Sequence, residues 1–84
     1  MVYSIYLTRT AKGQLNKIDK SAAKRIVKKL RSIAPDPFHY ITRLAGSDIY
    51  KLRVGDYRVK MTIEKDKLII IVIEVRHRRN IYKD

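Results

Sequence analysis

The fold of this chain is decided by one stretch, which reads Asp48-Ile-Tyr-Lys-Leu-Arg-Val-Gly-Asp-Tyr-Arg-Val-Lys-Met-Thr-Ile-Glu64. Apolar and other residues alternate on both sides of Gly55 and Asp56. Alternation with a period of two is typical of half-buried strands, because successive side chains point to opposite faces of a sheet. A glycine followed by an aspartate between two such runs predicts a tight β-hairpin.

A two-residue loop at Gly55 and Asp56 determines which residues of the two strands lie opposite each other. On the face that we assign to the core, the expected pairs are Val54 with Tyr57, Leu52 with Val59 and Tyr50 with Met61. On the other face lies a group that we call the cation patch, with Arg53 opposite Arg58 and Lys51 opposite Lys60. Directly opposed like charges destabilise a strand pair, so this patch indicates a polyanion ligand. The plain alternative is a solvated strand face in a very basic protein.

The residues before the hairpin predict a strand and a short helix. Residues 2–7 alternate, as a strand does, and apolar residues then recur at helical spacing over residues 9–18. Thr8 or Thr10 is expected to be the N-cap, because a hydroxyl can accept from the unpaired amides of a first helical turn.

A second helix is expected after an N-cap at Ser21, and Pro35 and Pro37 should end it. Its apolar stripe consists of Ala22, Ala23, Ile26, Val27, Leu30 and Ile33. Its remaining surface carries Lys24, Arg25, Lys28, Lys29 and Arg31. We expect this basic face to be solvated.

The residues after the hairpin predict a turn and a last strand. The turn is expected at Lys65 and Asp66, with Glu64 opposite Lys67. The last strand should run over residues 67–76 and begins with a stretch that is apolar on both faces. A strand of this kind is normally central and covered on both sides. It therefore needs the first strand as its second neighbour, in a direction that the sequence leaves open.

Together these elements predict a single α+β domain over residues 1–84, with two layers. The expected order is strand, helix, helix and then a mostly antiparallel strand meander (β-α-α-β-β-β), with the last strand central. A further short strand is expected over residues 41–44.

The last strand carries Ile69, Ile71 and Ile73 on the side of the cation patch. The helices should cover the opposite side, so these isoleucines would form an exposed apolar patch. Such patches usually mark a partner site. The alternative is that the C-terminal residues fold over them.

The C-terminal residues combine cations with rings, since Arg76, Arg78, Arg79 and Lys83 surround His77 and Tyr82. Guanidinium groups bind phosphates and rings stack on bases, so this tail predicts a grip on single-stranded RNA. Lys60 of the cation patch would add to the same RNA-binding surface. The alternative is a solvated, frayed tail.

Composition narrows the function further. The chain has 84 residues with 20 Lys and Arg against 8 Asp and Glu, a net charge of +12. This charge favours nucleic acid or an acidic protein as partner. There are no cysteines, and His39 and His77 are the only strong ligands left, so we expect no metal site and no cofactor. We see no signal peptide and no apolar run long enough to span a bilayer, which predicts a cytoplasmic protein without a membrane partner.

The side chains available for chemistry are cations, tyrosines and an imidazole, and this set suits a phosphodiester. When an RNA 2′-hydroxyl attacks its own phosphate, the phosphorane gains negative charge, which fixed guanidinium and ammonium groups stabilise. An arginine would act as an electrostatic clamp, because guanidinium groups normally stay protonated, or as an acid only where its environment is unusual.

Two motifs make the chain resemble the RelE/ParE toxin superfamily. They are Tyr50-Lys-Leu-Arg-Val-Gly-Asp-Tyr-Arg-Val59 and His77-Arg-Arg-Asn-Ile-Tyr82. The likeness covers essentially the whole chain and implies the fold derived above, with an antitoxin that wraps the toxin. Within the superfamily the RelE branch cleaves messenger RNA in the ribosomal A site. The ParE branch poisons DNA gyrase and generally lacks the nuclease residues.

The resemblance implies a metal-independent, ribosome-dependent endoribonuclease toxin. Its catalytic residues would be Lys51, Arg53, Arg58, Arg78 and Tyr82, with Arg76 or Arg79 as alternatives to Arg78. Arg53 stands where some members have lysine, which keeps the charge but disfavours proton transfer there. The implied partners are the ribosome, messenger RNA and an antitoxin, which Ile69, Ile71 and Ile73 would contact. Two other functions stay open: a gyrase inhibitor without chemistry, and a plain nucleic-acid-binding module.

Overall fold

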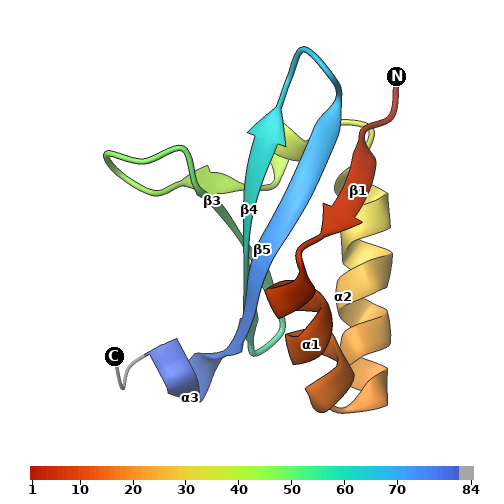
Figure 1. Ribbon diagram of the computed structural model, residues 1–84, viewed down its shortest axis with the longest axis vertical. Helices are drawn as coiled ribbons and strands as arrows, with labels where there is room; N and C mark the ends of the chain where they lie inside the picture. The colour runs from red at the N-terminus through yellow and green to blue at the C-terminus, as the bar shows by residue number, and fades with distance from the viewer. Residues whose placement is uncertain (82–84) are drawn as a thin grey trace.

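The computed structural model describes the backbone of residues 1–81 and the side chains of residues 1–79. Its elements are β1 (Ser4–Leu7), α1 (Arg9–Lys17), α2 (Lys20–Ile33), the 3-10 helix η1 (Pro37–His39), β2 (Thr42–Arg43), β3 (Tyr50–Val54), β4 (Tyr57–Glu64), β5 (Ile69–His77) and α3 (Arg78–Ile81). The strands form one sheet in the order β1-β5-β4-β3-β2 (Figure 1). The predicted α+β fold with the last strand inside the sheet is confirmed, and the short strand expected over residues 41–44 is β2.

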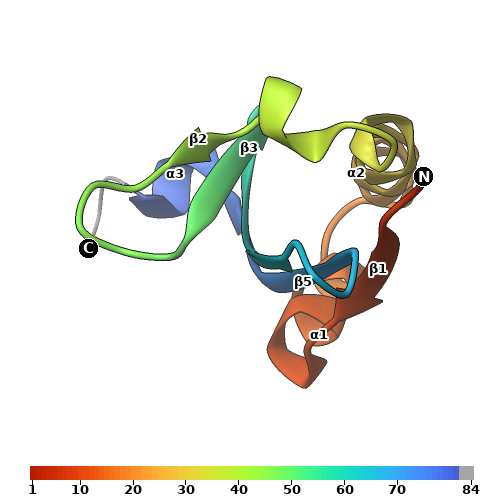
Figure 2. The same ribbon diagram turned by 90° about the horizontal axis from the view of Figure 1, so that it is seen from above.

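The sheet is mixed. β1 pairs with β5 in parallel, which is the direction that the sequence left open, and all other neighbours are antiparallel. Seen from above, the sheet bends, and α2 lies on its concave side (Figure 2). No helix of the described residues is long and apolar enough to cross a membrane.

The central hairpin has the predicted register. The Cα partners are Tyr50 with Met61, Lys51 with Lys60, Leu52 with Val59, Arg53 with Arg58 and Val54 with Tyr57. Gly55 has a φ of +58°, in the left-handed region that glycine enters without a steric penalty. The sequence pattern alone therefore positions the cation patch.

The turn between β4 and β5 differs from the prediction. Glu64 is the Cα partner of Ile69 rather than of Lys67, because four residues rather than two separate the strands. The last of the four, Leu68, has a φ of +54°, which is rare for a bulky side chain.

A second irregularity lies in the middle of β5. Met61 pairs with Val72, but the preceding Lys60 pairs with Glu74, so Ile73 is an extra residue in β5. Such a β-bulge reverses which face the later residues of its strand point to. Val75 consequently joins the core, and Glu74 turns to the side of the cation patch.

The core lies between the helices and one face of the sheet. It combines Ala11, Leu15, Ile26, Leu30 and Ile33 of the helices with Leu52, Val59, Met61, Ile70, Val72 and Val75 of the strands. Burying side chains of this kind contributes about 1.5–3 kcal/mol for each of the larger ones. Ile26, Leu30 and Ile33 of the apolar stripe expected on the second helix therefore belong to the core.

Helices α1 and α2 each begin with a side chain that caps their N-terminus. Thr8 caps α1, and its side chain accepts from the amide of Ala11 at 3.2 Å. Asp19 caps α2 by accepting from the amides of Ser21 and Ala22, so the prediction that Ser21 is the cap was wrong. An aspartate at this position satisfies two amides that have no partner in the helix.

Candidate nucleic-acid interface

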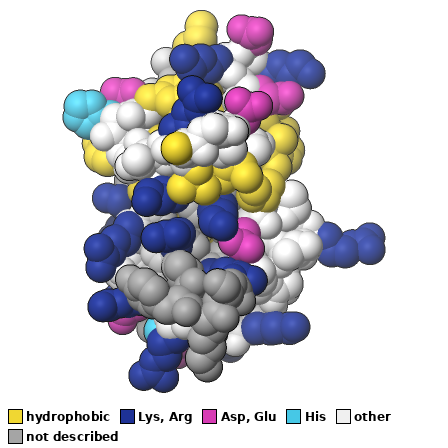
Figure 3. Space-filling model, turned by 90° about the vertical axis from the view of Figure 1, so that its left-hand side faces the viewer, with side chains coloured by type: hydrophobic (Ala, Val, Ile, Leu, Met, Phe, Trp, Pro, Cys, Tyr) yellow, Lys and Arg dark blue, Asp and Glu magenta, His cyan; other side chains and the backbone are white. Residues whose placement is uncertain are grey.

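The cation patch lies on the sheet face away from the helices, and the structure enlarges it. Arg58 has Arg53 as its Cα partner on one side and Arg76 on the other, so three arginines form a row across the sheet. Lys and Arg side chains crowd this face in Figure 3, and a hydrophobic area adjoins them. A row of like charges on neighbouring strands is unfavourable for folding alone.

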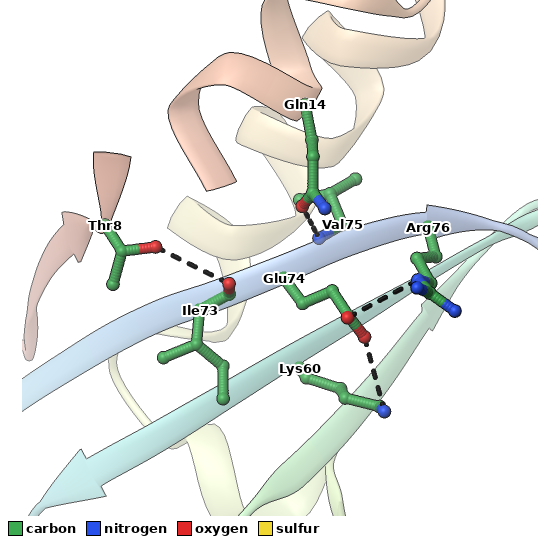
Figure 4. Close-up of polar contacts among 7 residues, drawn as sticks. All are labelled: Thr8, Gln14, Lys60, Ile73, Glu74, Val75 and Arg76. Atoms are coloured by element: carbon green, nitrogen blue, oxygen red, sulfur yellow. Dashed lines mark hydrogen bonds and ion pairs between the residues drawn. The ribbon is translucent and has the colours of Figure 1, made fainter. Parts of the chain in front are cut away.

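One carboxylate stands among these cations. Glu74 Oε2 lies 3.3 Å from Lys60 Nζ, and Glu74 Oε1 lies 3.4 Å from Arg76 Nε (Figure 4). Uninterrupted alternation along β5 would assign Glu74 to the other face of the sheet. The bulge at Ile73 brings it over. Two of the predicted RNA-binding cations are therefore ion-paired.

The edge of β5 beyond β1 is closed by side chains from the N-terminal half. Gln14 Oε1 accepts from the Val75 amide at 2.6 Å, and Thr8 Oγ1 donates to the Ile73 carbonyl at 3.5 Å (Figure 4). These contacts replace ladder bonds where β1 has ended, so α1 holds the bulged part of β5 in place.

A cavity of about 500 Å³ opens on the same face, and we call it the basic cavity. Its basic lining consists of Lys51, Arg53, Arg58 and Arg78. Its other lining residues include Tyr40, Thr42, Asp56 and Tyr57. In the part of the chain that the structure describes, none of the four cations forms an ion pair. The lining of the cavity thus has four cations and the carboxylate of Asp56, and its net charge is positive.

Helix α3 carries the last of these cations to the cavity. The Arg78 amide donates to the Asp56 carbonyl at 2.7 Å, which ties the end of β5 to the hairpin turn. The Arg79 amide donates to His77 Nδ1 at 3.1 Å, and the His77 ring stands edge-on to Tyr57 at 5.0 Å. Arg76, Arg78 and Arg79 were the alternatives for one catalytic arginine. Among these three described residues, Arg78 is the one that lines the basic cavity, and Arg76 is paired with Glu74.

The remaining predicted site residues divide into two groups. Ile69, Ile71 and Ile73 are half-buried rather than exposed, and Tyr6, the Cα partner of Ile71, is 58% exposed beside them. Tyr82 and Lys83 lie outside the described residues, so their roles stay predictions.

Sequence reasoning missed the part that α2 plays at this site. A Cβ placed on Gly55 would lie 3.8 Å from Nη1 of Arg25, and Lys29 Nζ lies 5.4 Å from the Tyr40 ring centroid. Residues four apart share one face of a helix, and this spacing was the available signal. The basic face of α2 therefore extends to the margin of the cavity instead of being merely solvated.

A second cavity of about 530 Å³, the helical groove, lies between α1 and α2. Its apolar residues are Leu7, Leu15, Ala23 and Val27, and its basic residues are Lys12, Lys24, Lys28 and Arg31. Ala23 and Val27, which belong to the apolar stripe expected on the second helix, are half-buried. Among the described residues, no three His, Cys, Asp or Glu side chains gather as a metal site would require.

Known proteins resemble the chain over almost its full length. The family model for the ParE toxin of type II toxin-antitoxin system, parDE, matches residues 5–82. The putative toxin RelE1 of Methanocaldococcus jannaschii is 26% identical over 89 residues, covering 100% of this chain and 99% of that protein.

Solved structures share the fold. A chain of the toxin-antitoxin complex RelBE2 from Mycobacterium tuberculosis has 21% identity and a TM-score of 0.84, with 93% of this chain and 100% of that chain covered. The archaeal RelE-RelB complex from Pyrococcus horikoshii gives 21% identity and a TM-score of 0.80, with 93% and 97% covered. Because the family model spans nearly the whole sequence, the chain belongs to the RelE/ParE superfamily of type II toxin-antitoxin toxins.

Proposed function

We propose that this toxin is a ribosome-dependent endoribonuclease that cleaves messenger RNA in the A site. The observation that carries the proposal is the basic cavity, where Lys51, Arg53, Arg58 and Arg78 meet without ion-pair partners among the described residues. An inhibitor that works only by binding has no need of such concentrated charge at one point.

In the proposed reaction the 2′-hydroxyl of one nucleotide attacks the adjacent phosphorus, and the bond from phosphorus to the 5′-oxygen breaks. The 2′-hydroxyl loses its proton and the leaving oxygen gains one, so the products are a 2′,3′-cyclic phosphate and a 5′-hydroxyl. Arg58 and Arg78 stabilise the charge of the phosphorane, and Lys51 and Arg53 orient the RNA. Removing one such donor typically costs about 100- to 1,000-fold in rate.

The position of Arg58 in the sheet supports this role. Its Cα partners Arg53 and Arg76 are both cations, and Arg58 is half-buried. A partly buried charge is screened less by solvent than an exposed one. Tyr82, implied by the resemblance, would stack on a base or help to activate the attacking hydroxyl. Tyr82→Phe separates these roles, because stacking survives loss of the hydroxyl.

The test uses purified protein, translating ribosomes and a defined message. The wild-type protein should cleave the message, Arg58→Ala should lose about 100-fold or more in rate, and Arg9→Ala should cleave normally. Arg9 is an exposed cation at the start of α1 and lines neither cavity. Unchanged cleavage by Arg58→Ala contradicts the assignment. Inhibition of gyrase supercoiling without cleavage supports the ParE-like alternative, and RNA retention without cleavage supports a plain binding module.

We further propose that a cognate antitoxin, both apolar and acidic, neutralises the toxin. Ile69, Ile71 and Ile73, which are half-buried on the sheet surface, would be covered by it. The helical groove, with its apolar floor and cationic rim, suits an acidic amphipathic segment of the same antitoxin. Apolar burial should supply most of the affinity, at about 25 cal/mol per Å² before ordering costs.

A further inference from the structure

Tyr40 lies in the wall of the basic cavity with about half of its surface open to solvent. The residue is 51% exposed, and it lines the cavity together with Thr42. A tyrosine ring normally contributes through burial of its large apolar surface. A ring left open beside a charged cavity therefore needs an explanation beyond folding.

The segment that presents this ring is firmly anchored. Pro37 is fully buried, and the Phe38 ring packs edge-on against Tyr50 at 5.5 Å and Tyr3 at 6.4 Å. The Tyr40 amide then donates to the Pro37 carbonyl at 3.0 Å. The backbone that carries the ring is thus held in position before any ligand arrives, which lowers the entropy cost of binding.

The surroundings select a ligand that is both flat and anionic. Lys29 Nζ lies 5.4 Å from the Tyr40 ring centroid, and Arg58 and Arg78 line the same cavity. A volume of about 500 Å³ is within the usual range of ligand sites, roughly 300–1,000 Å³. In a nucleotide, a planar base and a phosphate are joined through one sugar, so both ends would meet a suitable partner here.

A second tyrosine in the cavity is less available. Tyr57 also lines it, but Tyr57 is half-buried. Each tyrosine ring has a histidine ring edge-on to it, His77 for Tyr57 at 5.0 Å and His39 for Tyr40 at 5.4 Å between centroids, so exposure is what distinguishes the two tyrosines. Tyr40 is therefore the ring on which a base can stack.

We propose that Tyr40 and Thr42 form a nucleobase subsite. One base of a single-stranded RNA stacks on the Tyr40 ring, its neighbouring phosphate lies at Arg58 and Arg78, and the Thr42 hydroxyl contacts the base edge. The proposal rests on the proposed function in that RNA is the ligand, but it requires binding only and not cleavage.

The test measures binding of a short single-stranded oligoribonucleotide that carries 2-aminopurine, whose fluorescence falls when it stacks. At low ionic strength the wild-type protein and Tyr40→Phe should both quench it. Tyr40→Leu should lose the quenching and bind about 5- to 150-fold more weakly. Tyr6→Leu is the matched control, because Tyr6 is 58% exposed but lies outside the cavity, and it should behave as wild type.

Equal quenching by Tyr40→Leu and wild type overturns the subsite, as does a wild-type protein that does not bind the oligonucleotide. So does a Tyr40→Leu variant that loses only antitoxin affinity, because the surface then serves a protein partner. If Tyr40→Leu unfolds, Tyr40→Ser in parallel with Tyr40→Phe makes the same comparison.

Thr42→Val should keep the quenching and lose part of the preference among the four bases, and an unchanged preference removes Thr42 from the subsite. Cleavage is scored separately, so a protein that quenches through Tyr40 without cutting messages keeps the subsite and contradicts only the nuclease.

Discussion

Arg53 and Arg58 are Cα partners across the β3–β4 hairpin, and both line the basic cavity. Two guanidinium groups in opposed positions repel each other, whereas the charge of Arg76, on the far side of Arg58, is offset by Glu74. The site therefore costs the fold some stability, and this cost can be measured.

Replacing Arg58 should stabilise the protein while disabling it. Arg58→Gln removes the central charge of the row, so we expect the free energy of unfolding to rise by roughly 0.2–1 kcal/mol. We also expect message cleavage to fall by about 100- to 1,000-fold. Urea unfolding at low and high salt provides the measurement, and the gain should shrink as salt screens the charges. Arg9→Gln should change neither quantity, and a less stable Arg58→Gln protein would contradict this account.

Glu74 should restrain the affinity for RNA. Glu74→Gln removes the carboxylate that lies 3.3 Å from Lys60 Nζ and 3.4 Å from Arg76 Nε. We expect tighter RNA binding with a steeper salt dependence, because Lys60 can then release a counterion from the nucleic acid and a negative charge is lost from the site. Stability should fall by less than about 1 kcal/mol, since the pairs are partly exposed. Glu64→Gln, at the exposed end of β4, is the matched control; equal salt slopes for the two variants would argue against a restraining role.

His77 should contribute to cleavage through its Nδ1 atom, which accepts a hydrogen bond from the Arg79 amide. His77→Phe keeps a ring against Tyr57 but has no acceptor, so α3 should loosen and Arg78 should be held less well. We expect a loss of about tenfold in cleavage, as small misplacements of catalytic groups are costly. His77→Asn restores an acceptor and should recover part of the activity. Equal cleavage by His77→Phe and His77→Asn, whether low or normal, would show that the acceptor is unimportant.

Asp19 should make α2 sensitive to acid. Hydrogen bonds from the Ser21 hydroxyl, and then from the Ala22 amide, lower the pKa of this carboxyl below its ordinary value of 3.8. A depressed pKa in the folded state means that the stabilisation is complete above pH 3.8 and is lost as the pH falls through the lower folded value. Asp19→Ala should therefore be less stable than wild type at neutral pH, and the difference should shrink below pH 3.8. Thermal unfolding from pH 7 to pH 2.5 tests this, with Asp66→Ala as the control in an exposed turn.

In antitoxin binding, charge should affect mainly the association rate, and apolar contact should affect mainly the dissociation rate. Raising salt should slow association strongly and change dissociation little, because the charges mainly speed encounter. Ile71→Asp and Val27→Asp place a carboxylate in the sheet surface and the helical groove respectively, and each should speed dissociation if the antitoxin covers both. A dissociation rate that climbs steeply with salt would mean that ion pairs hold the complex.

Local sequence determined the hairpin and its cation patch. Alternation around Gly55 has a period of exactly two residues, so a tight turn leaves only one register in which Leu52 and Val59 are both buried. The apolar run of the last strand likewise required two neighbours, and β5 has them. These features depend on residues close together in the chain, where pattern and structure are directly linked.

Tertiary structure alone decided the composition of the site. The bulge at Ile73 is held by Thr8 and Gln14 from the other end of the chain, and it is the bulge that turns Glu74 toward the cations. Tyr40 likewise reaches the basic cavity because the η1 segment packs its Phe38 ring into the fold. Contacts between residues that are distant in sequence leave no periodic signal, because neither partner needs a particular local spacing to make them. The positive charge of the site could therefore be predicted from the sequence. The positions of the Glu74 carboxylate and the Tyr40 ring beside that charge could not.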